Sequence, residues 1–391
     1  MILELDINSL AAGGDGVGRD ETGRVTFVPR TAPGDRVRVR IIKQTKTFAR
    51  AELVEVLTPS PARVEPPCRH FTEGCGGCDW MHVSRAEQLA AKQAIVAGAL
   101  RKLEGLTVHP IADPAPPLGW RRRARFHVGG DAVGLYQLGT NRIVPIDSCP
   151  QLDPRLDAAY QKTVALTPPS GELALMVSEK GDIALATTRP WRLALGLVES
   201  DWLSGVVSAG VMVGEPVIEL EPGLWGSPWE FAQASAAGNA ALIARVHEAI
   251  GPGPGKLLEL FAGNGNLTRG LLAAGWSVTA TDGVKPPKPP TPDYLDGEVT
   301  DVLRRLRGSF DVVVLDPPRA GAADSIEHIV RLSPRTIAYV SCDPATLARD
   351  AVKLAESGYR ATDAWPIDLM PQTSHVEVVM RLEKHPREPS P

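Results

Sequence analysis

Five cysteines are the residues best suited to chemistry in this chain of 391 residues. Three of them are crowded between Cys68 and Cys78, and a fourth, Cys149, lies far downstream. Two glycines between Cys75 and Cys78 let the backbone bend so that both flanking sulfurs can face one centre. Four thiolates bind either zinc or a [4Fe–4S] cluster, and the spacing does not separate the two. It predicts a four-sulfur metal or cluster site, with unliganded reduced cysteines as the alternative.

The fifth cysteine, Cys342, follows an apolar run at 337–341 that is typical of a buried strand. A cysteine at the carboxyl end of such a strand can point into the crevice where open α/β sheets bind ligands. A buried structural cysteine is the alternative. Glu377 opens another apolar run, at 376–382, although a surface carboxylate would look the same in sequence.

Asp316 ends a third apolar run, at 312–315, and two prolines follow it. The prolines hold the backbone rigid over the expected ligand crevice. Asp-Pro-Pro at this place is typical of enzymes that methylate planar nitrogen or base substrates, as opposed to dehydrogenases. The bare string is also a common turn.

A glycine-containing turn follows the apolar run 257–261, with Gly263 and Gly265 before a helical segment. Without Cβ atoms the backbone can approach a ligand closely at a helix N-terminus. Asp282 ends the next apolar run and is placed to accept hydrogen bonds from a ribose. The pattern fits a binding site for NAD or for S-adenosylmethionine equally well. The alternative is a glycine-containing turn without a ligand and an acidic residue at the surface.

These side chains need a sheet whose strand ends meet at one edge. From about residue 231, apolar runs alternate with helical segments, beginning with an alanine-rich helix at 234–250. This alternation predicts a parallel, doubly wound α/β sheet. The proline-rich stretch 285–292 cannot form a helix and replaces the crossover helix expected there. The expected strands are 257–261, 277–281, 311–315, 336–341 and 376–382.

Two further regions precede this sheet. Residues 1–57 contain short apolar runs with glycine-containing turns and predict a small β-barrel. A helix is expected over 84–103, where Ser84 and Glu87 form a capping box. Residues 118–228 are expected to be mostly β. The expected domains are 1–58, 59–230 and 231–391.

Composition excludes several classes of protein. The chain is 43% hydrophobic and 23% charged, which argues against wholesale disorder. No apolar run approaches the roughly 20 residues that span a bilayer, and the start lacks a secretory signal pattern. We therefore expect a cytoplasmic protein. The net charge of −4 argues against a generally basic nucleic-acid coat protein.

Positive charge is nevertheless gathered in two places. Six basic residues and no acidic one lie from Arg36 to Arg50, and the alternation over 36–41 predicts a strand with three guanidiniums on one face. Arginine side chains bind phosphate groups and stack on unpaired bases, so the presence of two clusters favours a binding surface for RNA or DNA. The alternatives are a solvated strand face and a local cluster of salt bridges. The second cluster comprises Arg121, Arg122, Arg123 and Arg125.

Three runs near the C-terminus resemble the RNA uracil-5-methyltransferases, especially the bacterial 23S rRNA (uracil-5-)-methyltransferases. They are Leu315–Ala322, Tyr339–Asp350 and Asp368–Glu377. The resemblance covers the whole chain, since the N-terminal barrel is similar to a TRAM domain and the cysteine pattern is similar to the family's [4Fe–4S] site. It implies a Rossmann-like class I methyltransferase fold, a doubly wound α/β sheet, preceded by an OB-like RNA-binding barrel and a central, mostly-β iron–sulfur domain.

The resemblance also implies a mechanism and a set of site residues. Cys342 would add to C6 of an extruded uridine, preferably in 23S rRNA, and C5 would take a methyl group from S-adenosyl-L-methionine. Glu377 would remove the C5 proton, and Asp316 would lie where the cofactor meets the base. Cofactor contacts are implied for Gln233, Phe261, Gly263, Asn266, Asp282 and Asp316, and [4Fe–4S] ligation for Cys68, Cys75, Cys78 and Cys149.

The sequence departs from the family pattern at several positions. Ser235 stands where Asn is usual, Asp282 where Glu is usual, and Gln372 where His is usual. The proline-rich stretch borders the adenine side, where Glu298 is a candidate replacement contact. The alternatives are a tRNA uridine methyltransferase, a DNA or protein methyltransferase, and a non-catalytic RNA-binding or assembly factor. We expect RNA as the partner, no membrane, no obligate protein partner and a monomer.

Overall fold

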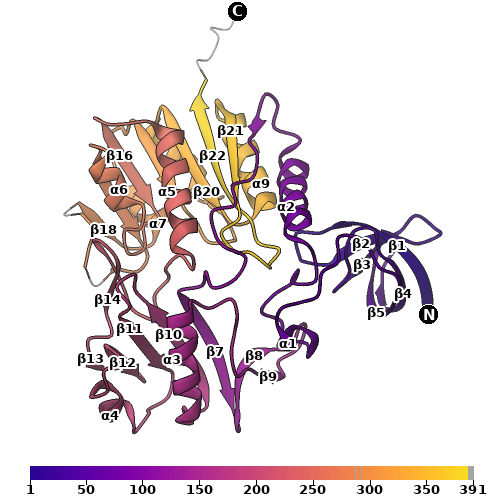
Figure 1. Cartoon of the computed structure of the whole chain (residues 1–391). Helices are drawn as coiled ribbons and strands as arrows, with labels where there is room; N and C mark the ends of the chain where they lie inside the picture. Colours follow the sequence, from indigo (N-terminus) through magenta and orange to yellow (C-terminus); the bar gives the residue numbers. More distant parts are fainter. Residues whose placement is uncertain (287, 292, 386–391) are drawn as a thin grey trace, which may run out of the picture.

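The chain forms a closed barrel, a seven-stranded sheet and an eight-stranded sheet (Figure 1), seen in a computed structural model that describes residues 1–286, 288–291 and 293–385. Pro287 and Pro292 of the proline-rich stretch, and residues 386–391, lie outside the described residues. In Figure 1 the barrel (indigo) lies to one side of the eight-stranded sheet (orange and yellow), and the seven-stranded sheet (magenta) lies below it.

The N-terminal barrel has the strand order β1-β2-β3-β5-β4. Alternate residues point inward, and Leu5, Ile7, Val28, Val37 and Val39 form its core. The predicted small β-barrel is therefore confirmed. Its strands are β1 (Ile2–Leu10), β2 (Gly16–Arg19), β3 (Val25–Val28), β4 (Arg36–Gln44) and β5 (Phe48–Thr58).

The arginine face expected on β4 is neutralised by neighbouring strands. Arg36 pairs with Glu4 of β1 at 3.2 Å, and Arg38 pairs with Glu4 at 3.3 Å and with Glu55 of β5 at 2.5 Å. Arg40 faces a glutamate of β5 in the same way. The alternation correctly predicted a strand, but its three guanidiniums form a salt-bridged surface because acidic residues stand opposite them in the barrel.

Two helices, α1 (Arg69–Thr72) and α2 (Arg85–Leu100), follow the barrel. The Ser84 hydroxyl accepts the Glu87 N–H at 3.4 Å, as the capping box predicts. Helix α2 ends before the predicted residue 103, because the Leu103 N–H closes a tighter turn on the Leu100 carbonyl.

The region expected to be mostly β forms the seven-stranded sheet, in the order β13-β12-β11-β10-β7-β8-β9. Helix α3 (Pro154–Ala165) and helix α4 (Ala194–Val198) pack on one face of it. A separate hairpin pairs β14 (Ile218–Glu221) with β15 (Leu224–Gly226). The seven strands are β7 (Arg123–Gly129), β8 (Ala132–Tyr136), β9 (Ile143–Pro145), β10 (Gly171–Val177), β11 (Ile183–Thr187), β12 (Gly205–Ser208) and β13 (Val211–Gly214).

The eight-stranded sheet has the order β18-β17-β16-β19-β20-β22-β21-β6. Strands β18 to β20 in this order are parallel, as predicted, whereas β22 runs antiparallel to both its neighbours because it follows β21 through a direct loop. The strands are β6 (Thr107–Val108), β16 (Lys256–Leu260), β17 (Ser277–Asp282), β18 (Tyr294–Asp296), β19 (Val312–Leu315), β20 (Thr336–Ser341), β21 (Tyr359–Ile367) and β22 (Glu377–Lys384).

Helices cover both faces of this sheet, as a doubly wound fold requires. One face packs against α5 and α6, and the other against α7, α8, α9 and the end of α2. No described residue between β17 and β18 is helical, in agreement with the proline-rich sequence. No helix in the described ranges is long and apolar enough to cross a membrane. The helices are α5 (Ala236–Ile250), α6 (Thr268–Ala273), α7 (Val299–Arg305), α8 (Ile326–Leu332) and α9 (Pro344–Glu356).

Candidate active site

Three sequence-predicted residues meet at one edge of the eight-stranded sheet. Asp316 follows β19 and Cys342 follows β20, and these parallel neighbours have their carboxyl ends at the same edge. Strand β22 runs antiparallel to β20 with Val378 opposite Ser341, so its first residue, Glu377, lies at that edge too. The antiparallel strand is therefore what brings the acid to the cysteine.

Glu377 is a buried carboxyl group. Only 5% of the residue is exposed, and its Oε1 has no hydrogen-bond partner among the described residues. Burial raises the pKa of Glu377 well above its usual range; the Asp316 carboxyl raises it further, and the Arg319 guanidinium opposes the shift. Burial also raises the pKa of Asp316 to about 7. Carboxyl groups held in this way are suited to proton transfer near neutral pH.

Arg319 is the basic residue beside the Cys342 thiol. Burial raises the pKa of Cys342, and the carboxyls of Glu377 and Asp316 add to the rise, while the charge and a hydrogen bond of Arg319 lower it. The same guanidinium contacts the His375 ring at 3.1 Å. Sequence reasoning gave Arg319 no role, although its position directly after Asp-Pro-Pro was an available signal.

Cys342 lines a cleft of about 720 Å³, which is formed by the N-terminal barrel, the cysteine segment with α2, and the loops at the edge of the eight-stranded sheet. The barrel contributes the β1–β2 loop, the cysteine segment contributes Gly76 and Gly77, and α2 forms a further wall. Its polar lining includes Arg121, Arg319 and His375. A volume of this size accommodates a small ligand or one nucleotide.

Helix α2 holds the loop at 368–376 that leads into Glu377. Lys92 Nζ donates to Asp368 Oδ1 at 2.6 Å, and both side chains are fully buried. Gln88 Nε2 donates to Gln372 Oε1 at 2.9 Å, and the Gln372 N–H donates back to Gln88 Oε1 at 3.1 Å. Gln372 is therefore a positioning residue for the loop.

The cysteine segment holds the same loop from the other side. Asp79 directly follows Cys78, and its N–H donates to the Gln372 carbonyl at 3.0 Å. Asp79 Oδ2 accepts both the N–H and the hydroxyl of Ser374, each at 2.9 Å. These hydrogen bonds couple the conformation of the cysteine segment directly to that of the loop before Glu377.

The glycine-containing turn lies at the end of β16. Phe261 and Gly265 have positive φ angles of 61° and 85°. A Cβ on Gly265 would lie 2.2 Å from Cβ of Pro290, so only glycine fits beneath the proline-rich stretch. The Gly263 N–H donates to Asp282 Oδ2 at 2.8 Å, which ties the turn to the end of β17.

Two other predicted cofactor residues already have protein partners. Asn266 exchanges two amide hydrogen bonds with the buried Asn239, at 2.7 and 2.8 Å. The backbone carbonyl of Gln233 accepts from Arg122 Nε at 2.9 Å, and the Gln233 side chain is half-buried. Sequence reasoning missed Asn239 because it lies inside a helix with no motif around it. Glu298 lies beside Gly283, at the end of β17.

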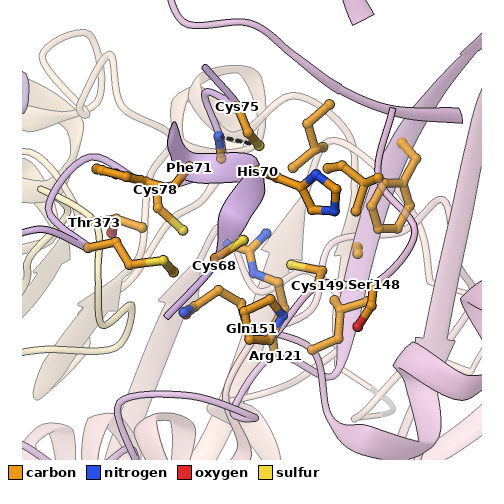
Figure 2. A pocket seen from close by; sticks show the side chains of 18 of the residues that line it. Cys68, His70, Phe71, Cys75, Cys78, Arg121, Ser148, Cys149, Gln151 and Thr373 are labelled. Atoms are coloured by element: carbon orange, nitrogen blue, oxygen red, sulfur yellow. Dashed lines mark hydrogen bonds between the residues drawn. The ribbon is translucent and has the colours of Figure 1, made fainter. Parts of the chain in front are cut away.

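The four predicted ligand cysteines line one cavity of about 130 Å³ (Figure 2). The Gly77 N–H donates to Cys75 Sγ at 3.4 Å. Burial raises the pKa of Cys149 to about 11 and that of Cys78 further, and the neighbouring thiols add to both shifts. Gly77, Arg121 and Thr373 line this cavity as well as the catalytic cleft, so a single wall separates the two.

Within the described ranges, no group of three or more His, Cys, Asp or Glu side chains is arranged to hold a metal ion. The four cysteines nevertheless line one shared cavity.

Comparison with known proteins gives matches along the whole chain. Family models match as a TRAM domain at 2–54 and as a tRNA (Uracil-5-)-methyltransferase at 302–385. The 23S rRNA (uracil(1939)-C(5))-methyltransferase RlmD of Shewanella baltica is 30% identical, covering 97% of this chain and 95% of the relative. An uncharacterized RNA methyltransferase of Thermosynechococcus vestitus is 32% identical, covering 97% of both.

One solved structure confirms the predicted fold class. The Pyrococcus abyssi tRNA (uracil-54, C5)-methyltransferase, solved in complex with S-adenosyl-L-homocysteine, superimposes with a TM-score of 0.72 at 22% identity. The match covers 97% of this chain and 100% of that chain.

Proposed function

Because this chain belongs to the family of RNA (uracil-C5)-methyltransferases, we propose that it methylates C5 of a uridine in 23S ribosomal RNA, with S-adenosyl-L-methionine as the methyl donor. The single observation that carries the proposal is the meeting of Cys342, Glu377 and Asp316 at one edge of the eight-stranded sheet, beside the cleft that Cys342 lines. Alignment with a relative named for 23S rRNA over nearly the whole of both chains favours ribosomal over transfer RNA.

Cys342 begins the proposed reaction. Its thiolate forms a bond from Sγ to uracil C6, and the electrons of the C5–C6 double bond move toward O4, which makes C5 nucleophilic. Arg319 favours the thiolate through its charge and its hydrogen bond to the sulfur. The uridine must leave its stack to reach the cleft.

Glu377 completes the reaction. C5 forms a bond to the methyl group, and the donor sulfur keeps the electron pair of the bond that breaks. Glu377 then removes the C5 proton, the C5–C6 double bond re-forms, and the C6–Sγ bond breaks to return the Cys342 thiolate. The buried, unpaired Oε1 of Glu377 supports this role.

The methyl donor is assigned to the turn after β16. Phe261, Gly263 and Asp282 lie at the carboxyl edge of the sheet, where open α/β folds bind nucleotides. Gln233 and Asn266 complete the predicted set, and Glu298 is an additional candidate beside the end of β17. Asp316 lies between this turn and Cys342, at the junction of donor and base.

We assign the cavity lined by the four cysteines to a [4Fe–4S] cluster. The donor set fits the group, because four cysteines line one cavity and a [4Fe–4S] cluster is held by four cysteine thiolates. Cys68, Cys75, Cys78 and Cys149 would hold it. When bound, the cluster would supply four iron–sulfur bonds that tie residues 68–78 to Cys149, and residue 79 would then hold the loop before Glu377.

Purification without air should give a brown protein that absorbs at about 400 nm and contains about four iron atoms per chain. The Cys149→Ser variant should lose the colour, because three sulfurs do not complete the ligand set. Cys342→Ser is the matched control and should stay brown. A colourless wild-type protein with one zinc ion per chain would contradict the assignment.

Deleting the gene should remove one 5-methyluridine from 23S rRNA, as mapped by mass spectrometry of total RNA fragments. Restoring the wild-type gene should return the modification. A loss confined to transfer RNA would establish the tRNA alternative. Unchanged 5-methyluridine in every RNA, with RNA binding retained, would instead support a non-catalytic factor.

A further inference from the structure

The outer face of β7 carries a row of two arginines and a histidine. Phe126 and Val128 point into the core of the seven-stranded sheet, so the alternate residues Arg123, Arg125 and His127 point to the opposite face. Successive members of this row are about 6.8 Å apart along the strand.

Each side chain of the row lies against an aromatic ring from another segment. Arg123 is 5.6 Å from the ring centre of Phe231, and Arg125 is 5.2 Å from that of Trp229. His127 stacks on the ring of Tyr136, with ring centres 3.7 Å apart and an interplanar angle of 12°. The three pairs together are called the β7 platform below.

The arginines of the β7 platform have no carboxylate partner in the part of the chain that the structure describes, in contrast to the arginines of β4. Arg123 donates only to the carbonyls of Ala232 and Glu230, at 3.3 and 2.9 Å. Burial, and to a lesser extent the neighbouring arginines, lower the pKa of Arg123 to about 10. In the adjoining strand β10, the carboxylate opposite this row belongs to Glu172, which faces His127 at the far end of the row. The platform therefore presents uncompensated positive charge.

Aromatic surface accompanies this charge. Phe231 is 67% exposed and Tyr136 is 39% exposed, and Arg125 is exposed between them. Bases stack on exposed rings and guanidinium planes whatever their sequence, while the cations attract the phosphates. This alternation of rings and basic side chains matches the alternation of bases and phosphates along a single nucleic-acid strand.

The β7 platform is continuous with the catalytic cleft. Arg121, two residues before Arg123, lines the cleft that contains Cys342. At the other end, Tyr136 lines a hollow of about 370 Å³ that also includes Gly76, and Gly76 lines the cleft as well. A strand of RNA whose uridine occupies the cleft can therefore pass directly onto the platform.

We propose that the β7 platform binds the unpaired nucleotides that flank the target uridine. Their bases stack on Phe231, Tyr136 and the Arg125 plane, and their phosphates lie along the cations. The proposal rests on RNA being the substrate, and it assigns the recognition of the flanking single strand to the central sheet rather than to the arginine face of the barrel.

The test uses the full-length protein and a 23S rRNA fragment with unpaired nucleotides beside the target uridine. The double variant R125A/Y136A should bind this fragment roughly 25-fold more weakly or worse, because each of the two lost stacks weakens binding by about 5-fold or more. The turnover rate at saturating RNA should stay near the wild-type value, since neither residue touches the reacting atoms. Because Arg125 also lines the four-cysteine cavity, the variant should keep the iron content of the wild type, which shows that this cavity is intact. The matched control is R192A/L195A, which removes an exposed arginine and an exposed leucine near α4 and should bind normally.

A second measurement does not depend on the variants. Wild-type protein cross-linked by ultraviolet light to the fragment carrying 4-thiouridine in the flank should yield labelled peptides from 123–136 or 229–231. The platform proposal would be overturned if R125A/Y136A bound the fragment as well as the control does, or if the cross-links were confined to the barrel. In either case, methylation by the wild type would leave the proposed function intact. If the wild type neither binds nor methylates RNA, both proposals fail.

Discussion

Replacing Cys342 with alanine should abolish methyl transfer and prevent covalent attachment to RNA that contains 5-fluorouridine. The fluorine at C5 cannot be removed as a proton, so the wild-type protein should remain bonded through Cys342 to C6 after the methyl group is added. The alanine variant has no atom that can form this bond. Loss of a nucleophile that acts with its neighbours as one unit lowers turnover by roughly 10⁴-fold or more.

The experiment separates chemistry from folding by comparing methylation with RNA affinity. Cys342 is only partly buried and lies outside the hydrophobic cores on the two faces of the eight-stranded sheet, so the variant should bind the RNA fragment as the wild type does. An adduct that migrates with the protein in a denaturing gel should appear with wild type alone. An adduct that persists in the C342A variant would refute the thiolate mechanism.

Replacing Glu377 with glutamine should stop the reaction one step later. The amide cannot accept the C5 proton, so turnover should fall by about 10²- to 10⁴-fold, the usual contribution of a general base. Because Cys342 and the methyl donor are still in place, the covalent adduct should accumulate even with ordinary uridine RNA. Glu383→Gln, in the same strand but exposed at its far end, is the matched control and should turn over normally.

Glu377 also sets the expected pH dependence. Its pKa is raised by burial and by Asp316, so the carboxylate that accepts the proton is lost as pH falls through this raised value, well above the usual range of a glutamate. Burial also raises the pKa of the Cys342 thiol, so the thiolate that attacks C6 forms more readily at higher pH. Turnover should therefore rise with pH across the neutral range. A rate that is constant down to pH 5 would contradict the assignment of Glu377 as the base.

Much of this protein is determined by its sequence alone. The period-two alternation over 36–41 specifies a strand, and the apolar runs from residue 257 onward specify the strands of a doubly wound sheet, because each pattern fits one secondary structure. Asp316 and Cys342, at the carboxyl ends of two such runs, could be named as site residues because these ends meet at one edge of such a sheet. Glu377 begins its run and is implied only by the family resemblance, and the antiparallel direction of β22 is what brings it to that edge.

Only the tertiary structure decided which charges are free. In sequence the arginines of β4 and β7 looked alike, yet Glu4 and Glu55 neutralise Arg38, whereas Arg125 lies on the ring of Trp229. The tertiary structure also decided the partner of Asn239, a residue of α5 whose side-chain amide donates a hydrogen bond to Asn266 in the turn before α6. A strand fixes its own periodicity through local backbone geometry, but the partner of a side chain is set by strand order and packing between distant segments. That pairing determines whether a cation stabilises the fold or remains available to bind RNA.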